Sequence, residues 1–196
     1  MSQIKLKHSG GNGVIIAAPS SNPAADRTIT LPDLRADITL ANGITEADLF
    51  QLTADVTVSG DTDLSTNWER PNTANDGFGK LGTGMSFSGA TWTFPSIGIY
   101  HVLFNGMLYG NGGSGTTQFQ ILATEDNSNY GLQSSAHISV SNGTFNSCCP
   151  TAVIDVTNTS NVKVKFRATS SNSNQLVGSN TAVGLTYVTF IQLGDT

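Results

Sequence analysis

Apolar and polar residues alternate along most of the chain after residue 44, which is the pattern of β-strands with one buried face. The period is clearest over 183–193, where Val183, Leu185, Tyr187, Thr189, Ile191 and Leu193 fall on one side of the expected strand. Further strands are predicted at 85–87, 92–94, 99–109, 119–123, 136–140, 152–156 and 162–168. About eight to ten strands at this spacing predict an all-β antiparallel sandwich or jelly roll.

The sequence pattern from 44 to 76 indicates different types of secondary structure in different segments. Thr45 and Asp48 have the spacing of a capping pair, which is compatible with a helix start between 44 and 49. Strict alternation runs from Phe50 to Val58, so one strand is predicted there. The polar stretch 60–76 is predicted to be a long loop.

Residues 1–43 differ from the rest of the chain and are predicted to form a small N-terminal β arm or stalk. They contain two short alternating segments around Gly10–Gly13 and a near-repeat in which Ile-Thr-Leu occurs at 29–31 and again at 38–40. Segments this short are stable only when they are stacked or paired with other chains. We expect three copies to associate here, or to contact a larger assembly, through Ile4, Leu6, Ile29, Leu31, Ile38 and Leu40. The alternative is a hairpin that folds back onto the main domain, residues 44–196.

Charge is scarce and unevenly placed. Only 12% of the residues are charged, the net charge is −5, and residues 81–162 contain no lysine or arginine. Acid–base chemistry and phosphate handling need clustered ionisable groups, so this block argues against an enzyme. The acidic balance argues against nucleic-acid binding. Lys163, Lys165 and Arg167 alternate on one strand, where a solvated face is favoured over a phosphate-binding patch.

No metal, cofactor or catalytic site is predicted. His8, His101 and His137 lie far apart, and the carboxylates of Asp61 and Asp63 form only a weak calcium-like pattern. The adjacent Cys148 and Cys149 are expected to be free thiols, because a disulfide between neighbours is strained. No apolar run is long enough to span a membrane, and the first residues lack a secretory h-region, so synthesis and assembly in a cytoplasm are expected.

Two aromatic residues in polar stretches, Trp68 and Tyr130, are candidates for stacking against a glycan. Trp92, beside Phe94, is expected in the core or at a subunit interface instead.

The run Phe94-Pro-Ser-Ile-Gly-Ile-Tyr100-His-Val-Leu-Phe104 resembles the core motif of C1q/TNF-like domains, in which an aromatic-Pro-x-x-Gly-x-Tyr segment enters a central strand. The strand at 183–193 is similar to the closing strand of that family, and the resemblance covers about residues 47–194. It implies a jelly-roll head that trimerises along a three-fold axis. The residues that it implies for the head core or the trimer axis are Phe94, Tyr100, Val102, Phe104, Tyr187 and Ile191.

The N-terminal segments 4–11 and 30–33 resemble the start of phage structural proteins, in which a short β stem precedes a C1q-like head. Together the two resemblances imply a non-enzymatic homotrimeric protein on the exterior of a virion. A short stem suits capsid decoration, a cement protein or a short head fibre that contacts the major capsid protein. The alternative is a tail fibre or receptor-binding tip that recognises host surface glycans.

Overall fold

The computed structural model describes residues 3–7, 10, 13–17, 43–71, 79–111, 115–178 and 184–196. The chain divides into two compact units, Met1–Ala41 and Asn42–Thr196. In the first unit, β1 (Gln3–Lys7) and β2 (Gly13–Ala17) form an antiparallel hairpin that pairs Ile4 with Ile16 and Leu6 with Val14. Ile29, Leu31, Ile38 and Leu40 lie outside the described residues, so the contacts proposed for the stem stay a prediction.

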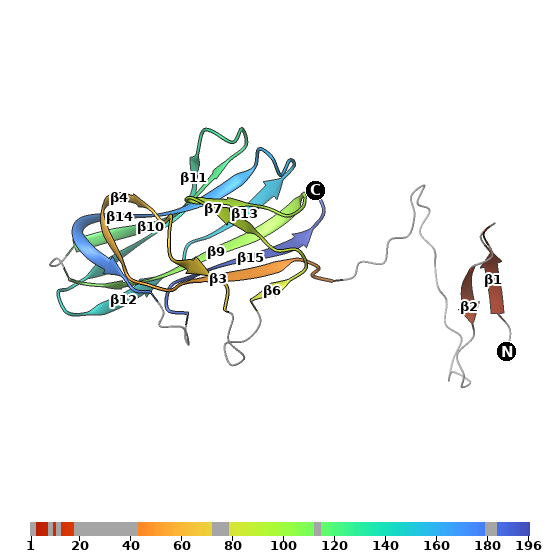
Figure 1. The fold of residues 1–196 in the computed structure, drawn as a ribbon, viewed down its shortest axis with the longest axis horizontal. Helices are drawn as coiled ribbons and strands as arrows, with labels where there is room; N and C mark the ends of the chain where they lie inside the picture. Colours follow the sequence, from red (N-terminus) through yellow and green to blue (C-terminus); the bar gives the residue numbers. More distant parts are fainter. Residues whose placement is uncertain are drawn as a thin grey trace. The chain divides into compact units, whose positions relative to one another are not determined.

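The second unit, which we call the head, is an antiparallel sandwich whose strands lie in two layers (Figure 1). The first layer has the order β13 (Thr151–Val156), β9 (Gly98–Tyr109), β15 (Tyr187–Gly194), β3 (Ala47–Leu52), with β5 (Trp68–Glu69) and β6 (Lys80–Leu81) paired to β3. The second layer has the order β11 (Gly131–Val140), β10 (Gly115–Thr124), β14 (Lys163–Leu176), β4 (Val56–Asp63), with β8 (Thr91–Thr93) and β7 (Ser86–Ser88) beyond the start of β14. The predicted all-β antiparallel sandwich is confirmed.

The long strand β9 belongs to both layers. Its first half pairs with β13 and β15, while its last residues pair with β12 (Phe145–Cys148) and with the end of β14. A single strand that crosses between layers fixes their spacing, and the apolar side chains between them form one core.

Alternation along β9 places Tyr100, Val102 and Phe104 in this core, each no more than 1% exposed, and Phe94 lies beside them. Trp92 is at the centre, with ring centroids 4.5 Å from Phe50 and 5.3 Å from Phe190. Each large side chain buried in this way contributes ~1.5–3 kcal/mol relative to its exposed state. Four of the residues assigned to the head core or trimer axis are therefore core residues.

The other two, Tyr187 and Ile191, lie on the opposite side of β15. Val188 and Phe190 are the buried apolar residues of that strand, at 0% and 1% exposure, and Gln192 is buried on the same side. Because side chains alternate across a strand, Tyr187 and Ile191 point away from the core. Only the trimer-axis half of their assignment is compatible with this position.

The structure corrects the prediction for 44–76. Residues 47–52 form β3 instead of a helix, the alternation from Phe50 to Val58 is split into two strands, and β4 and β5 occupy part of the expected loop. Asp48 does not cap a helix, because its carboxylate is 2% exposed and accepts hydrogen bonds from Arg70 Nε (2.8 Å), Arg70 Nη2 (2.7 Å) and the Met85 amide (2.6 Å). A long-range ion pair thus decided this local conformation.

Candidate functional site: an apolar sheet face

The outer side of the first layer is unusually apolar. The strand register places its outward residues in rows, so the row through Val153 of β13 contains His101 of β9, Ile191 of β15 and Ala47 of β3. The next row contains Thr151, Leu103, Thr189 and Leu49. Farther along β9 are Asn105 opposite Tyr187, Met107 opposite Ser147, and Tyr109 opposite Phe145. We call these outward residues, with Ile99, Asp155 and Gln51 on the same strands, the apolar face.

Several members of this face are large and open to solvent. Val153 is 64% exposed and Phe145 is 61% exposed, and the ring of Phe145 lies 4.7 Å from that of Tyr109. Leu193, in line with Ile191 on β15, is 59% exposed. Single exposed apolar residues are ordinary, but a contiguous set on one sheet face marks a surface that meets another molecule.

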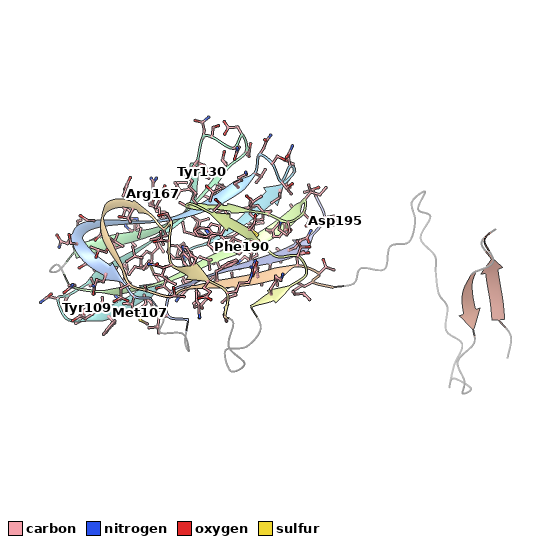
Figure 2. The ribbon with its side chains drawn as sticks, viewed as in Figure 1. Met107, Tyr109, Tyr130, Arg167, Phe190 and Asp195 are labelled. Atoms are coloured by element: carbon pink, nitrogen blue, oxygen red, sulfur yellow. The ribbon has the colours of Figure 1, made fainter. Side chains whose placement is uncertain are left out.

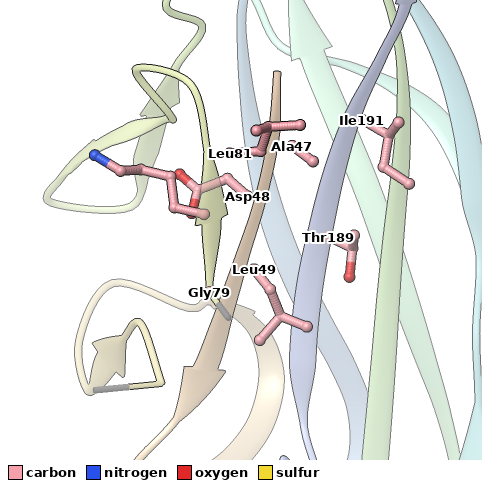
Figure 3. A pocket seen from close by; sticks show the side chains of 8 residues that line it. Ala47, Asp48, Leu49, Gly79, Leu81, Thr189 and Ile191 are labelled. Carbon is pink, nitrogen blue, oxygen red and sulfur yellow. The ribbon is translucent and has the colours of Figure 1, made fainter. Parts of the chain in front are cut away.

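A shallow hollow of about 240 Å³ indents the edge of the face (Figure 3). The residues that line it are Ala47, Asp48 and Leu49 of β3, Thr189 and Ile191 of β15, and Gly79, Lys80 and Leu81 in and before β6, and most of the lining surface is apolar. Leu81 is itself 50% exposed, so the hollow continues the apolar face to the edge of the sheet. Its apolar lining suits an apolar side chain better than a polar ligand.

Two carboxylates, those of Glu46 and Asp48, form hydrogen bonds beside this edge of the sheet. Glu46 accepts hydrogen bonds from the amides of Thr83 and Gly84, both at 2.9 Å, and Asp48 holds Arg70. Arg70 also lies over the ring of Phe50, at 4.2 Å, and its pKa is raised by the hydrogen bond to Asp48. The segment after β6 is therefore hydrogen-bonded to Glu46 and Asp48, next to the hollow.

Charge is nearly absent from the apolar face. Among the described residues of β13, β9, β15 and β3, the acidic, basic and histidine side chains that point outward are His101 and Asp155. Glu69 and Lys80 lie at its edge, on β5 and β6. Depletion of charge at the centre of a patch is the compositional signature of a protein–protein interface.

The outer side of the second layer is different. Arg167 of β14 donates to Asp63 at 2.6 Å and to Asp61 at 3.4 Å, and the Thr169 hydroxyl donates to Asp61 at 2.8 Å. Lys165 lies 3.9 Å from Asp63. Figure 2 shows Arg167 and Tyr130 on one side of the head and Met107 and Tyr109 on the other, with Phe190 between them. One layer thus presents a polar, ion-paired surface and the other an apolar one.

These ion pairs also account for two predicted features. Lys163, Lys165 and Arg167 occupy alternate positions of β14 that are not buried, so they share the outer side as the pattern indicates. The carboxylates of Asp61 and Asp63 both form ion pairs with Arg167. In the part of the chain that the structure describes, no group of three or more His, Cys, Asp or Glu side chains is placed to hold a metal ion.

The two candidate glycan contacts differ in their surroundings. Trp68 lies in β5, packs against the core with its ring 5.8 Å from Trp92, and donates from Nε1 to the Leu64 carbonyl at 3.1 Å. The expectation that Trp68 lies in a loop is wrong. Tyr130 does lie outside the strands, with Lys165 Nζ 4.2 Å from its ring centroid. Both side chains are partly exposed, and of the two it is Trp68 that packs against the core.

Cys148 and Cys149 are free thiols at the end of β12. Burial raises the pKa of Cys148 to about 11, and burial also raises the pKa of Cys149. Both are therefore protonated near neutral pH and poor nucleophiles. Among the described residues no helix is long and apolar enough to cross a membrane.

The sequence reasoning missed most of the apolar face. Leu49, Leu103, Val153 and Phe145 were not singled out, although one signal was available. In the run 99–109, both the odd and the even positions are largely apolar, which is typical of a strand that is covered on both sides.

Comparison with known proteins bears on the fold. Murine APRIL at pH 5.0 superimposes with a TM-score of 0.52 and 13% identity over 76% of this chain and 98% of that one. Murine APRIL at pH 8.5 gives a TM-score of 0.53 with 14% identity, over 76% and 98% of the two chains. Eiger TNF from S. frugiperda gives a TM-score of 0.56 with 14% identity, over 79% and 96%.

The head therefore has the TNF-like jelly-roll fold, as the motif at Phe94–Phe104 implies. No family model and no curated protein matches the chain. At this level of identity the likeness shows a shared architecture, while the role of the protein has to be argued from its own residues.

Proposed function

We propose that the chain is a non-enzymatic structural protein that associates as a homotrimer through the apolar face and sits on the exterior of a phage virion. The observation that carries the self-association is the contrast between the two outer surfaces of the head. The outer side of the first layer is apolar and nearly uncharged in its four central strands, whereas the outer side of the second layer carries several ion pairs. Burying the first against other copies removes exposed apolar area from water and desolvates few charges.

A second copy is the occupant that best fits this face. The face offers both exposed apolar side chains, such as Val153 and Phe145, and an apolar hollow lined by Leu49 and Ile191. A surface that carries projections at one place and a hollow at another is complementary to itself in a head-to-tail arrangement, and such an arrangement closes into a ring when the rotation permits. The TNF-like fold of the head makes three copies the expected number.

The place on a virion is supported by the sequence. The N-terminal segments 4–11 and 30–33 resemble phage stems, and the chain between them and the head is short. The first 80 residues carry most of the charge, so specific polar contacts with a capsid would come from the arm and the lower loops, while the neutral end of the head faces solvent. Capsid decoration, cement or a short head fibre fits this arrangement.

The self-association is tested by sedimentation of the full chain. We expect a species of three times the chain mass of 20.5 kDa. Ile191→Glu places a charge on the apolar face and should shift the species towards monomer. Gln118→Glu adds the same charge to β10, on the outer side of the second layer, and should leave the trimer intact. A wild-type monomer, or equal behaviour of the two variants, would contradict the proposal.

The position on the particle is tested separately. An electron cryo-microscopy map of the virion should show trimeric density on the capsid, and particles that lack the protein should release their genome at lower temperature if it acts as cement. Equal heat resistance would exclude the cement role and leave decoration. Density at the tail alone would refute the capsid placement.

A tail tip that binds host glycans is the second candidate, and the position of the partly exposed Tyr130 outside the strands favours it. Lys165 supports that ring by a cation–π contact, and Tyr130 lies 3.5 Å from the Thr91 hydroxyl. Tyr130→Ala should then weaken attachment to cells, whereas Trp68→Ala should act mainly through stability. Unchanged attachment by a folded Tyr130→Ala protein would rule out this contact.

A further inference from the structure

The most informative residue of the apolar face is its histidine. His101 occupies the middle of β9, and the register sets it directly between Ile191 of β15 and Val153 of β13. Its neighbours along the same side of β9 are Ile99 and Leu103. An imidazole surrounded in this way is half-buried in the free chain. A partner laid over the face would cover it completely.

We infer that His101 makes the self-association dependent on pH, so that the trimer dissociates in mild acid. This inference rests on the proposed function, because it assigns a regulatory group to the same face. Neutral imidazole can be buried against apolar groups at modest cost, but an imidazolium cannot be buried without a counter-charge. Association should therefore require the neutral form of His101.

The groups that face His101 offer little compensation. On β13 the nearest ionisable side chain is Asp155, which pairs with Ile99 and so lies diagonal to His101. On β15 the outward neighbours are Thr189, Ile191 and Leu193, and next to them on β3 are Ala47 and Leu49, none of which is charged. Lys80, at the edge beyond β3, is held by the Thr83 carbonyl at 3.2 Å.

Farther along the layer, Tyr187 lies opposite Asn105 and Tyr109 lies opposite Phe145. Cys149 follows β12, and burial raises the pKa of its thiol, so it supplies no negative charge near neutral pH. Asp155 is thus the single carboxylate on these four strands that is near enough to stabilise a protonated His101, among the residues described.

The sign of the dependence follows from proton counting. The free chain can bind a proton at His101, whereas the associated chain cannot, so lowering the pH favours the free chain. If the bound form excludes the proton entirely, the association constant falls by up to about tenfold per protomer for each pH unit through which the free imidazole is protonated. For three protomers the limit is about 10³-fold per pH unit.

The experiment is sedimentation equilibrium of the full chain at several concentrations between about pH 8 and pH 5. The wild type should be trimeric at the upper end and dissociate progressively towards the lower end. His101→Gln keeps a polar side chain of similar reach that does not titrate, and its association should change little with pH. His137→Gln is the matched control, because His137 is exposed on β11 of the other layer and pairs with Gln118. Both variants retain His8, so any effect of that residue is common to them.

A second variant tests the role of Asp155. Asp155→Asn removes the neighbouring carboxylate, which favours protonation of His101 in the free chain, so dissociation should begin at a lower pH than in the wild type. The inference is overturned if the wild-type trimer is insensitive to pH, if His101→Gln keeps the wild-type slope, or if His137→Gln abolishes it. A chain that is monomeric even at pH 8 would instead refute the proposed self-association, so the two failures are distinguishable.

Discussion

Breaking the Asp48–Arg70 pair gives the sharpest test of the packing described above. The Asp48 carboxylate is 2% exposed and accepts two hydrogen bonds from Arg70, at 2.8 and 2.7 Å. In Arg70→Ala it would keep only the Met85 amide, at 2.6 Å, as a partner among those described for it. Removing one partner of a buried ion pair costs ~3–5 kcal/mol. Because the Arg70 side chain itself is 34% exposed and water can reach its position, we expect about 3 kcal/mol, the lower end of that range.

The assay is urea unfolding followed by tryptophan fluorescence, since Trp92 and Trp68 lie in and against the core. Protein concentration is held fixed, because association with other copies also contributes to apparent stability. Arg167→Ala is the control: its partners Asp63 and Asp61 are 30% and 63% exposed, so we expect a loss of no more than ~1 kcal/mol. The full cycle with Asp48→Ala should give a coupling energy of at least ~1.5 kcal/mol for the pair. Equal losses for Arg70→Ala and Arg167→Ala would refute the reasoning.

Three further outcomes are expected. Phe166→Ala removes a fully buried ring that lies 5.3 Å from Phe104, and should lower the free energy of unfolding by ~3–5 kcal/mol in the same urea titration; a loss near zero would contradict its place in the core. Gly98→Ala should also destabilise the head, because the φ angle of Gly98 is 141° and the new Cβ would lie 2.7 Å from the Gly194 carbonyl oxygen. An unchanged melting temperature would contradict this expectation. Iodoacetamide should modify Cys149 before Cys148, because Cys149 is exposed and the pKa of the Cys148 thiol is about 11, so its reactive thiolate is scarce until the pH approaches that value. The two rates should become equal when the protein is unfolded in urea. Equal rates in the folded protein would contradict this order.

Much of the fold can be predicted from local pattern. The alternation in 99–109 predicts a strand that is present as β9, and the strand predicted at 183–193 is present from Tyr187 onward as β15, with Val183 outside the described residues. The motif from Phe94 to Phe104 implies the TNF-like jelly roll, and the solved structures support that fold. These predictions succeed because side-chain periodicity and turn residues act over a few positions, and the sequence displays them directly.

Prediction from the sequence is weaker where the local conformation depends on residues that are distant in the chain. Between 44 and 58, the capping pair and the long alternation are misleading, because the buried carboxylate of Asp48 is satisfied by Arg70 and by Met85, far along the chain. Trp68 is placed in a loop by its polar neighbours, yet pairing of β5 with β3 brings its ring against the core. Partners that are this distant in the chain leave no signal in the local sequence pattern.

The sequence by itself determined that this chain forms an antiparallel β-sandwich with an uncharged central block, because strand periodicity and composition are properties of neighbouring residues. It also determined that β15 has two distinct sides. Which side of β15 faces the core was decided only by the tertiary structure, because a shift of one residue in register exchanges the two sides. That choice buries Phe190, turns Ile191 outward, and assembles Ile191, His101 and Val153 from three strands into one row of the apolar face.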